Sequence, residues 1–408
     1  MKLLLFDDRT ADAWRPFAAT RPAGELLYGA MLLRQRIERA LGLAASAALS
    51  RPWLTAFAEP GAPPVRERRL EPAGEARVIL CARFVPHDGP LALEDDGPLT
   101  LTSGDEVAGW LVPAGAEPPS PDLLLDPAEL PGSAGREIGG SLVPGPWTLV
   151  DQNADRLAAD LAADRDANST ESAEPPAGVH VLGRESLRLG DGATLEPGVV
   201  LDLTDGPIRL GDGVLVRSGA RLTGPLFAAS GSRLLGGSIA SLSAGPRSHL
   251  RGEIEHSIVL GYSNKAHDGF LGHAYVGRWV NLGALTTNSD LKNNYGQVRL
   301  GGPGDGTDTG LRKMGCLLGD HVKSAIGTLF DTGAVVGAGA NVFGATRPPK
   351  WVPPFSWGGA EDSPAFRRDA FLETARTVMG RRDVDWSPSL ARWLGDVWDA
   401  AMDGRMAS

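Results

Sequence analysis

The stretch Leu260–Leu300, LGYSNKAHDGFLGHAYVGRWVNLGALTTNSDLKNNYGQVRL, decides how the rest of the chain is interpreted. Its first and last parts, LGYSNKAHDGFLG and TTNSDLKNNYG, are rich in Asn, Lys, His, Asp and Tyr. The segment between them consists mostly of small and aliphatic residues. This contrast indicates a polar site carried by a repetitive scaffold.

The scaffold is indicated by spacing. Aliphatic residues recur about every six positions and are followed by Gly or by Gly and Asp, as in Leu189–Gly192, Leu210–Gly213, Val276-Gly277, Leu282-Gly283 and Leu318–Asp320. Hexapeptide periodicity of this kind is typical of a parallel β-helix, whose coils stack aliphatic side chains inward. Gly suits the sharp turns because it accepts positive φ. The alternative is a Gly-rich, loop-rich domain in which the spacing is accidental.

LGYSNKAHDGFLG followed by NLGALTTNSDLKNNYG resembles the acyltransferase half of the bacterial bifunctional enzyme that makes UDP-N-acetylglucosamine. The whole chain resembles a variant UDP-N-acetylglucosamine diphosphorylase/glucosamine-1-phosphate N-acetyltransferase family. The resemblance implies an α/β nucleotidyltransferase-like N-terminal domain, an all-β left-handed parallel β-helix and an α-helical C-terminal tail. It also implies acetyl-CoA as co-substrate and a homotrimer.

Composition excludes several other classes of protein. The 408 residues suffice for two or three domains. A net charge of −10 argues against nonspecific nucleic-acid binding, which depends on clustered positive charge. Cys81 and Cys316 fall in different expected domains, so we expect neither a disulfide framework nor a cysteine metal site. With no signal peptide or membrane-spanning run, we expect a cytoplasmic protein without membrane partners.

The N-terminal region begins with two features of an open α/β sheet. Lys2–Phe6 is predicted to be a buried strand that delivers Asp7 and Asp8 to its carboxyl edge, where such sheets bind ligands. Helical periodicity is expected after Pro22, and Arg77–Val85 reads as another strand.

In the variant family, FDD, TRPAGEL and CARFVP occupy motif positions of the nucleotidyltransferase domain. The usual Gly-rich loop, whose backbone amides cradle a triphosphate, is not visible. We expect Arg21 and Arg83 to contact phosphate, and Asp7 or Asp8 to bind Mg²⁺. The alternative is that the two aspartates cap the next turn and that Arg21 forms a structural ion pair.

The remaining organisation follows from composition and periodicity. Trp147–Leu161 is expected to be helical, and 163–178 is a polar, Pro-containing linker. This divides the chain into 1–162, the linker 163–178, the β-helix 179–346 and the tail 347–408. In the tail, Ser363-Pro364 and Ser387-Pro388 each predict a helix start. The second helix carries an apolar stripe that the β-helix or a neighbouring subunit should cover.

Acetyl transfer to an amino sugar needs a base near neutral pKa, which a histidine supplies. His267 is the candidate catalytic base because Lys265-Ala266-His267 matches the Lys-Ala-Gly-His segment of the bifunctional enzyme, although the Gly is missing here. The alternative is a solvent-exposed turn histidine. His273 is expected to be structural.

Substrate-binding candidates surround it in the sequence. Lys265 and Lys292 are cations suited to a sugar phosphate, and Asn294-Tyr295 match an acceptor-binding Asn-Tyr pair of the resembling family. His256 stands at a position that is basic in the better-known enzyme.

Ala284 and Ser324 match CoA-contacting positions of the resembling family, and both could equally be turn residues. No cysteine is placed to form an acyl-enzyme intermediate, so direct attack is favoured.

The sequence therefore predicts a transferase of sugar-nucleotide biosynthesis. Its acceptor would be a sugar phosphate, most plainly glucosamine-1-phosphate, and its N-terminal product a nucleotide sugar. A noncatalytic sensing or scaffolding β-helix is the alternative, because fold alone does not establish activity.

Overall fold

The N-terminal sheet is organised around β1 (Lys2–Phe6) in this computed structural model, which describes residues 1–93, 97–168 and 174–406. The sheet order is β10-β8-β9-β6-β1-β4-β5. Its other strands are β4 (Ala45–Ser50), β5 (Val65–Glu67), β6 (Arg77–Cys81), β8 (Leu99–Ser103), β9 (Glu106–Val112) and β10 (Ala134–Glu137). Strands β5, β4, β1 and β6 run parallel, and β9 is antiparallel to β6. The expected first strand is confirmed; its apolar run is buried on both faces, as parallel strands require.

Two expectations for this region need correction. The segment Arg77–Val85 is not one strand, because the chain turns after β6 and forms β7 (Phe84–Pro86), which pairs with β11 (Gly140–Leu142). The helix expected after Pro22 starts only at α2 (Leu33–Leu41), and residues before it form β2 (Leu27–Tyr28) and β3 (Met31–Leu32). Gly29 makes this hairpin with φ +63, and its amide is satisfied by Asn153 Oδ1 rather than by a helical carbonyl.

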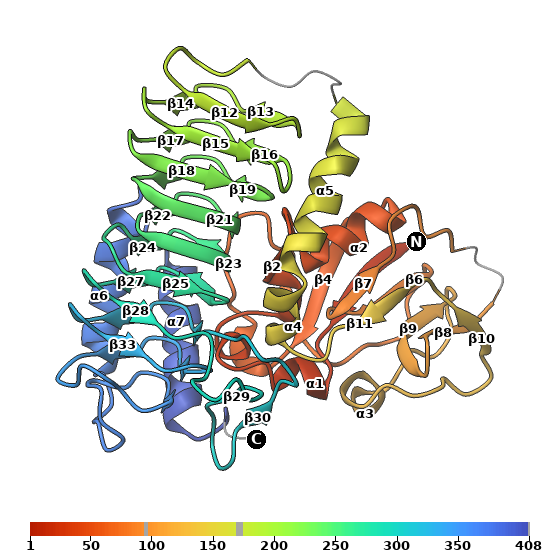
Figure 1. The fold of residues 1–408 in the computed structure, drawn as a ribbon. Coiled ribbons are helices and arrows are strands. Elements are labelled where there is room, and N and C mark those ends of the chain that lie inside the picture. Colours follow the sequence, from red (N-terminus) through yellow and green to blue (C-terminus); the bar gives the residue numbers. More distant parts are fainter. Residues whose placement is uncertain (94–96, 169–173, 407–408) are drawn as a thin grey trace.

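Short helices connect and flank the sheet. They are α1 (Arg9–Asp12), η1 (Phe17–Ala19), η2 (Ala23–Glu25), η3 (Pro52–Leu54), α3 (Pro121–Leu125), α4 (Pro146–Asp151) and α5 (Asn153–Asn168). The expected helix over 147–161 is thus two helices, and α5 continues to Asn168, inside the segment expected to be linker. Figure 1 shows α5 leading from the N-terminal region towards the first coils of the following domain.

The second region is a parallel β-helix, as expected. One face is the eight-stranded sheet β14 (Thr194–Leu195), β17 (Leu215–Val216), β20 (Arg233–Leu234), β22 (His249–Leu250), β24 (Asn264–Lys265), β27 (Asn281–Leu282), β32 (Lys323–Ser324) and β35 (Asn341–Val342). The larger sheet contains β12 (His180–Gly183), β13 (Leu187–Leu189), β15 (Val200–Leu203), β16 (Ile208–Leu210), β18 (Ala220–Thr223), β19 (Leu226–Ala228), β21 (Gly237–Ala244), β23 (Glu253–Gly261), β25 (Phe270–Gly272), β26 (Tyr275–Arg278), β31 (Leu317–Leu318), β34 (Val335–Val336) and β36 (Trp351–Val352). Two small pairs complete it: β28 (Thr287–Asn288) with β33 (Leu329–Phe330), and β29 (Arg299–Leu300) with β30 (Thr307–Asp308).

Aliphatic ladders hold the coils together. Leu201, Leu222, Ile239, Ile254 and Leu271 are consecutive register partners, and all are buried. Each coil therefore covers the apolar side chain of the one before it, which explains the hexapeptide periodicity. The left-handed sense of the β-helix stays a prediction.

The tail forms α6 (Arg368–Gly380) and α7 (Pro388–Met402), drawn in blue in Figure 1. The cap at Ser387 is confirmed, since its side chain accepts the Leu390 amide. The helix start expected at Ser363-Pro364 is wrong: the Pro364 carbonyl accepts from the Trp357 amide, and Ala365 pairs with Ser356 in a bridge. These contacts engage the backbone of Pro364 and Ala365 in extended pairing, so these residues do not form the first turn of a helix.

The N-terminal sheet, the β-helix and the tail share buried cores. Tyr275 of the β-helix is fully buried, and its hydroxyl bonds to both the amide and the carbonyl of Leu27. The apolar stripe of α7, which includes Trp393, packs with Phe57 and with Trp279 of the β-helix. Within the described ranges, no helix has the length and apolarity that a membrane crossing requires.

Candidate functional site

A cavity of about 700 Å³ lies at the carboxyl edge of the parallel strands. Arg51 and Arg68, which directly follow β4 and β5, line it together with Arg9 at the start of α1. Trp351 and the C-terminal segment around Met402 also line it. Open α/β sheets bind ligands at this edge, and the volume is that of a small-molecule site.

The cavity carries an excess of positive charge. Five arginines line it, Arg9, Arg15, Arg51, Arg68 and Arg405, against the single carboxylate of Asp12. Asp12 lies 2.6 Å from Arg51 and also pairs with Arg68. Burial raises the pKa of Asp12, although both arginines oppose this effect. The remaining charge suits an anionic ligand.

Arg15 is the arginine best placed to receive such a ligand. Arg9 pairs with Asp126 and Arg405 with Asp403, whereas Arg15 has no ion pair among the residues that the structure describes. Its side chain is half-buried at the cavity wall. A guanidinium there can form charge-assisted hydrogen bonds to phosphate oxygens.

Planar apolar groups share the wall with these cations. Trp53 is half-buried and fixed by its indole N–H, which donates to the Ala19 carbonyl at 3.1 Å. Trp351 lines the same cavity from the β-helix side. A wall that offers both aromatic faces and guanidinium groups is suited to a ligand with a planar base and phosphates.

Asp7 and Asp8 are not among the lining residues of this cavity, and their carboxylates accept hydrogen bonds from protein donors. Asp7 accepts from the Ala23 amide at 3.0 Å, from the Ser50 hydroxyl at 2.5 Å and from Arg51 at 3.2 Å. Asp8 caps α1 through the Ala11 amide and bonds to Arg83 at 2.7 Å. Both carboxylates are buried.

The residues present do not fit a bound metal ion. Neither aspartate has an oxygen without a protein donor. In the described ranges there is also no group of three or more His, Cys, Asp or Glu side chains placed to hold a metal. The assignment of Mg²⁺ to Asp7 or Asp8 stays a prediction.

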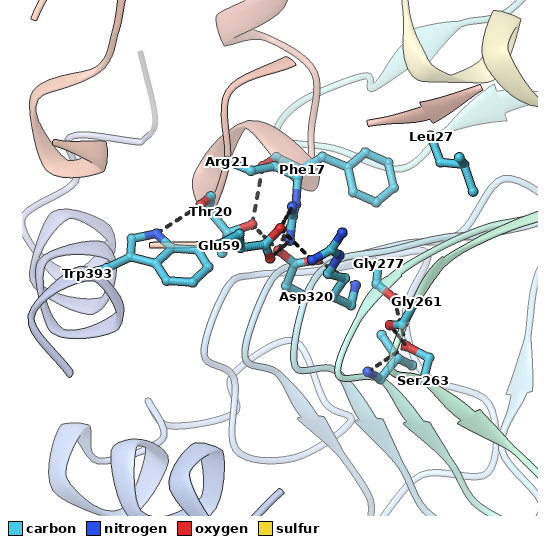
Figure 2. Close-up of polar contacts among 12 residues, drawn as sticks. Phe17, Thr20, Arg21, Leu27, Glu59, Gly261, Ser263, Gly277, Asp320 and Trp393 are labelled. Atoms are coloured by element: carbon cyan, nitrogen blue, oxygen red, sulfur yellow. Dashed lines mark hydrogen bonds and ion pairs between the residues drawn. The ribbon is translucent and has the colours of Figure 1, made fainter. Parts of the chain in front are cut away.

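Arg83 and Arg21 both lie away from solvent. Arg83 bonds to Asp8 and, at 2.8 Å, to Glu106. Arg21 is 0% exposed and binds Asp320 of the β-helix and Glu59 of the N-terminal region, as Figure 2 shows. Burial alone would lower the pKa of Arg21, but the two carboxylates raise it above its ordinary value.

Other groups complete the Arg21 cluster. The Thr20 hydroxyl donates to Asp320 at 2.7 Å, and the Trp393 indole of α7 donates to the Thr20 carbonyl at 3.0 Å (Figure 2). Arg278 pairs with Glu59 at 2.7 Å. The geometry of Arg21 therefore matches the structural ion-pair alternative, and it joins three parts of the chain.

The cavity arginines could have been found from one signal. Arg51 follows the last residue of β4, and Arg68 follows the last residue of β5, as Asp7 follows β1. The first residues after parallel strands meet at one sheet edge. Arg51 and Arg68 can be predicted at this edge only if Ala45–Ser50 and Val65–Glu67 are known to be strands of the same sheet.

The β-helix site begins with Lys265, which points into the coil. It is buried at a position that pairs with Leu250 in the aliphatic row of the preceding coil. Its ammonium donates to the carbonyls of Arg251 at 3.1 Å and His267 at 2.6 Å. Burial lowers the pKa of Lys265 to about 8. This geometry places Lys265 as a support for the His267 turn rather than as an open phosphate ligand.

His267 itself is exposed at the turn that Lys265 supports. Asp268 beside it pairs with Arg251 at 3.0 Å, and the Asp268 carbonyl accepts from the Leu285 amide of the next coil. Among the described residues the imidazole has no hydrogen-bond partner, so its nitrogens are open to a substrate.

The other polar candidates lie in an exposed loop before β29. Lys292 donates to the Gln297 carbonyl, and Asn294 accepts from the Gly296 amide at 3.0 Å. Tyr295 is 69% exposed with φ +57. The three residues share one turn, and no described contact joins this turn to His267.

The two CoA candidates lie at one corner of the β-helix. The Ala284 carbonyl accepts from the Gly327 amide of the next coil. Ser324 is buried and its hydroxyl lies 2.8 Å from that of Thr286. Leu285 and Ile326 at the same corner are 59% and 77% exposed. Apolar side chains are therefore exposed at the corner beside the His267 turn.

A second histidine has a carboxylate partner that sequence reasoning missed. His273 Nδ1 lies 2.8 Å from Asp290, and its ring stacks on His256 at 4.9 Å. Burial and the neighbouring His273 lower the pKa of His256. The pairing joins positions of adjacent coils, so only the coil register could have predicted it.

Comparison with known proteins adds two findings. Residues 3–166 match the family described as sugar nucleotidyl transferase. The N-terminal region is therefore similar to sugar nucleotidyl transferases over almost all of its length. The chain is also 28% identical over 91 residues to a bifunctional sugar-1-phosphate nucleotidylyltransferase/acetyltransferase of Sulfurisphaera tokodaii, a match covering 22% of this chain and 23% of the relative. With the β-helix, these findings fit the bifunctional family that the sequence resembles and support a transferase.

Proposed function

We propose that the chain is a bifunctional transferase of sugar-nucleotide biosynthesis, which joins a nucleotide to a sugar-1-phosphate and acetylates an amino-sugar phosphate. The observation that carries the first activity is the arginine-lined cavity at the carboxyl edge of the sheet, most of whose lining residues lie in the segment matching the sugar nucleotidyl transferase family. The Sulfurisphaera tokodaii relative is described with both activities.

In the nucleotidyl transfer, a phosphate oxygen of the sugar-1-phosphate attacks the α-phosphorus of a nucleoside triphosphate. The α–β P–O bond breaks, and pyrophosphate leaves with its electron pair. Such a reaction needs mainly positioning and neutralisation of charge. Arg15, Arg51 and Arg68 would contribute the charge, and Trp53 would hold the base.

In the acyl transfer, the acceptor nitrogen attacks the thioester carbonyl of acetyl-CoA. The C–S bond then breaks, and the CoA thiolate leaves and takes up a proton. His267 would accept the proton from the attacking nitrogen, and Lys265 would position the turn that carries it. Lys292, Asn294 and Tyr295 would meet the acceptor, and Ala284 and Ser324 would lie along CoA.

In a homotrimer, the acyl-transfer residues named above would meet between neighbouring subunits. Glucosamine-1-phosphate is the acceptor we propose, and a nucleotide sugar such as UDP-N-acetylglucosamine is the product. The exposed Leu285 and Ile326 beside the His267 turn support a subunit contact there. A neighbouring copy could then bring its exposed loop 292–297 to His267.

Two measurements on the full chain test the proposal. Pyrophosphate release is followed with UTP, Mg²⁺ and N-acetylglucosamine-1-phosphate, and then with other nucleotides and sugars. Thiol release from acetyl-CoA is followed with amino-sugar phosphates. His267→Ala should lower thiol release by about 10² or more and leave pyrophosphate release intact. If neither product appears but the ligands bind, the chain is a sensor or scaffold and the proposal fails.

A further inference from the structure

A second cavity, of about 380 Å³, lies between the β-helix and the end of α6. Its floor is the outer row of the eight-stranded sheet, and its roof includes Arg381 and Arg382 directly after the helix. It shares no lining residue with the cavity at the edge of the N-terminal sheet.

The floor is a polar ladder rather than an apolar surface. His249, Asn264, Asn281 and Lys323 are consecutive register partners of β22, β24, β27 and β32. The Asn264 amide donates to the Asn281 side-chain oxygen at 3.0 Å. The ladder therefore offers amide, imidazole and ammonium groups in one line across adjacent coils.

The lining carries positive charge with no carboxylate opposite it. Lys323, Arg381 and Arg382 all line the cavity, and no Asp or Glu does. The neighbouring Asp383 is exposed and pairs with Arg247 instead. Clustered cations in a partly buried site cost free energy unless an anion offsets them.

Hydrogen bonds in the cavity are also incomplete. The Nε of Arg382 is buried and has no hydrogen-bond partner among the described residues, while its Nη2 lies 3.3 Å from His249 Nδ1. Lys323 donates to the His321 carbonyl at 3.1 Å. An ammonium has three N–H groups, so donors remain for a ligand.

The pKa values of two lining cations, Lys323 and Arg382, are both lowered. Burial lowers the pKa of Lys323 to about 8. Burial, followed by the charges of Arg381, Arg233 and Arg247, lowers the pKa of Arg382. No carboxylate contributes to either shift.

We propose that this cavity is a binding site for a small molecule carrying a phosphate group. The guanidinium of Arg382 and the ammonium of Lys323 match phosphate oxygens, and the Asn264–Asn281 pair can bond hydroxyl groups of an ester. The volume leaves room for more than a free phosphate ion, which favours a phosphate ester of a polyol or sugar. The site does not depend on either proposed transfer reaction.

Calorimetric titration of the full chain tests the site, with glucose 1-phosphate in one series and orthophosphate in another. Lys323→Met and Arg382→Ala should each weaken one binding event at least about tenfold, a change of about 1.4 kcal/mol. Lys323→Arg should preserve it. Arg367→Ala, which removes an exposed charge beside the start of α6, and Arg15→Ala in the other cavity should also leave it unchanged.

The two series distinguish the source of the phosphate, because the tighter ligand identifies an ester or a free ion. Circular dichroism establishes that the variants are folded. Crystals soaked in selenate give a second readout, an anomalous peak between Lys323 and Arg382. Equal affinities for all folded variants, or wild-type binding that disappears entirely in Arg15→Ala, would overturn the proposal, as would no binding at all.

Discussion

The guanidinium of Arg21 lies 2.6 Å from the carboxylate of Asp320, although 299 positions separate the two residues in the sequence. Both side chains are almost fully buried. The pair links the N-terminal region to a turn of the β-helix, and the Trp393 indole of α7 bonds to the neighbouring Thr20. The contact therefore couples the packing of all three regions.

Breaking this pair should destabilise the whole chain. Arg21→Met leaves Asp320 and Glu59 with less compensating charge, which should cost about 3–5 kcal/mol. Urea denaturation followed by circular dichroism measures the loss, and Arg392→Ala is the exposed control. In the double variant Arg21→Met/Asp320→Asn the cost should be smaller than the sum of the single costs. Additive costs would show that the two residues are not energetically coupled.

Lys265 should matter more for acetyl transfer than for stability. Lys265→Met places an apolar side chain in the aliphatic row beside Leu250 and removes a buried ammonium, so the melting temperature should stay the same or rise. The His267 turn loses its anchor, and thiol release should fall about tenfold to a hundredfold. Lys265→Arg is the charge-retaining comparison. Unchanged thiol release would remove Lys265 from the positioning role.

Acid should destabilise the fold partly through His249. Burial, then Arg382 and Arg233, lower its pKa from 6.5 to about 4. Between these values the unfolded chain binds a proton that the folded chain does not, so stability falls as pH drops from 6.5 towards 4. In phosphate-free buffer, wild type should lose more melting temperature between pH 7.5 and 5 than His249→Gln. Equal losses would contradict the shift.

The apolar corner should hold subunits together. Ile326→Asp places a charge where we propose a subunit contact, so sedimentation should change from trimer to monomer, and thiol release should be lost while pyrophosphate release remains. Val181→Asp, an exposed apolar position on β12, is the matched control and should change neither. A wild-type chain that sediments as a monomer at micromolar concentration would rule out the trimer.

Local pattern was sufficient to predict much of the fold. The β-helix is predicted by the sequence repeat, because each coil places an aliphatic residue in the same buried row, as Leu201, Leu222 and Ile239 do. The last helix follows from the Ser387 cap and its apolar stripe. Ser363-Pro364 carried the same local signal, yet bridging contacts with Ser356 and Trp357 used its backbone. Tertiary contacts overrode the cap there.

The candidate site was harder to predict because its parts come from separate segments. Asp7 and Asp8 follow β1 at the carboxyl edge, as the sequence predicts, but the ion pairs of Asp7 with Arg51 and of Asp8 with Arg83 depend on strand order. Arg15 and Trp53 were not selected, since neither has a local motif. The sequence predicts Lys265 as a phosphate ligand, whereas its side chain points into the coil. This direction follows from the pairing of Lys265 with Leu250, which the sequence alone does not show.

We expect the arginine-lined cavity to bind the nucleotide sugar, and calorimetric titration with UDP-N-acetylglucosamine measures this binding. Removing the Arg15 guanidinium in Arg15→Ala should weaken binding about ten- to a hundredfold, the range for a lost charge-assisted hydrogen bond. Arg392→Ala, an exposed arginine of α7, should bind as wild type does. Equal affinity in Arg15→Ala and wild type would show that the nucleotide sugar does not bind through Arg15 in this cavity.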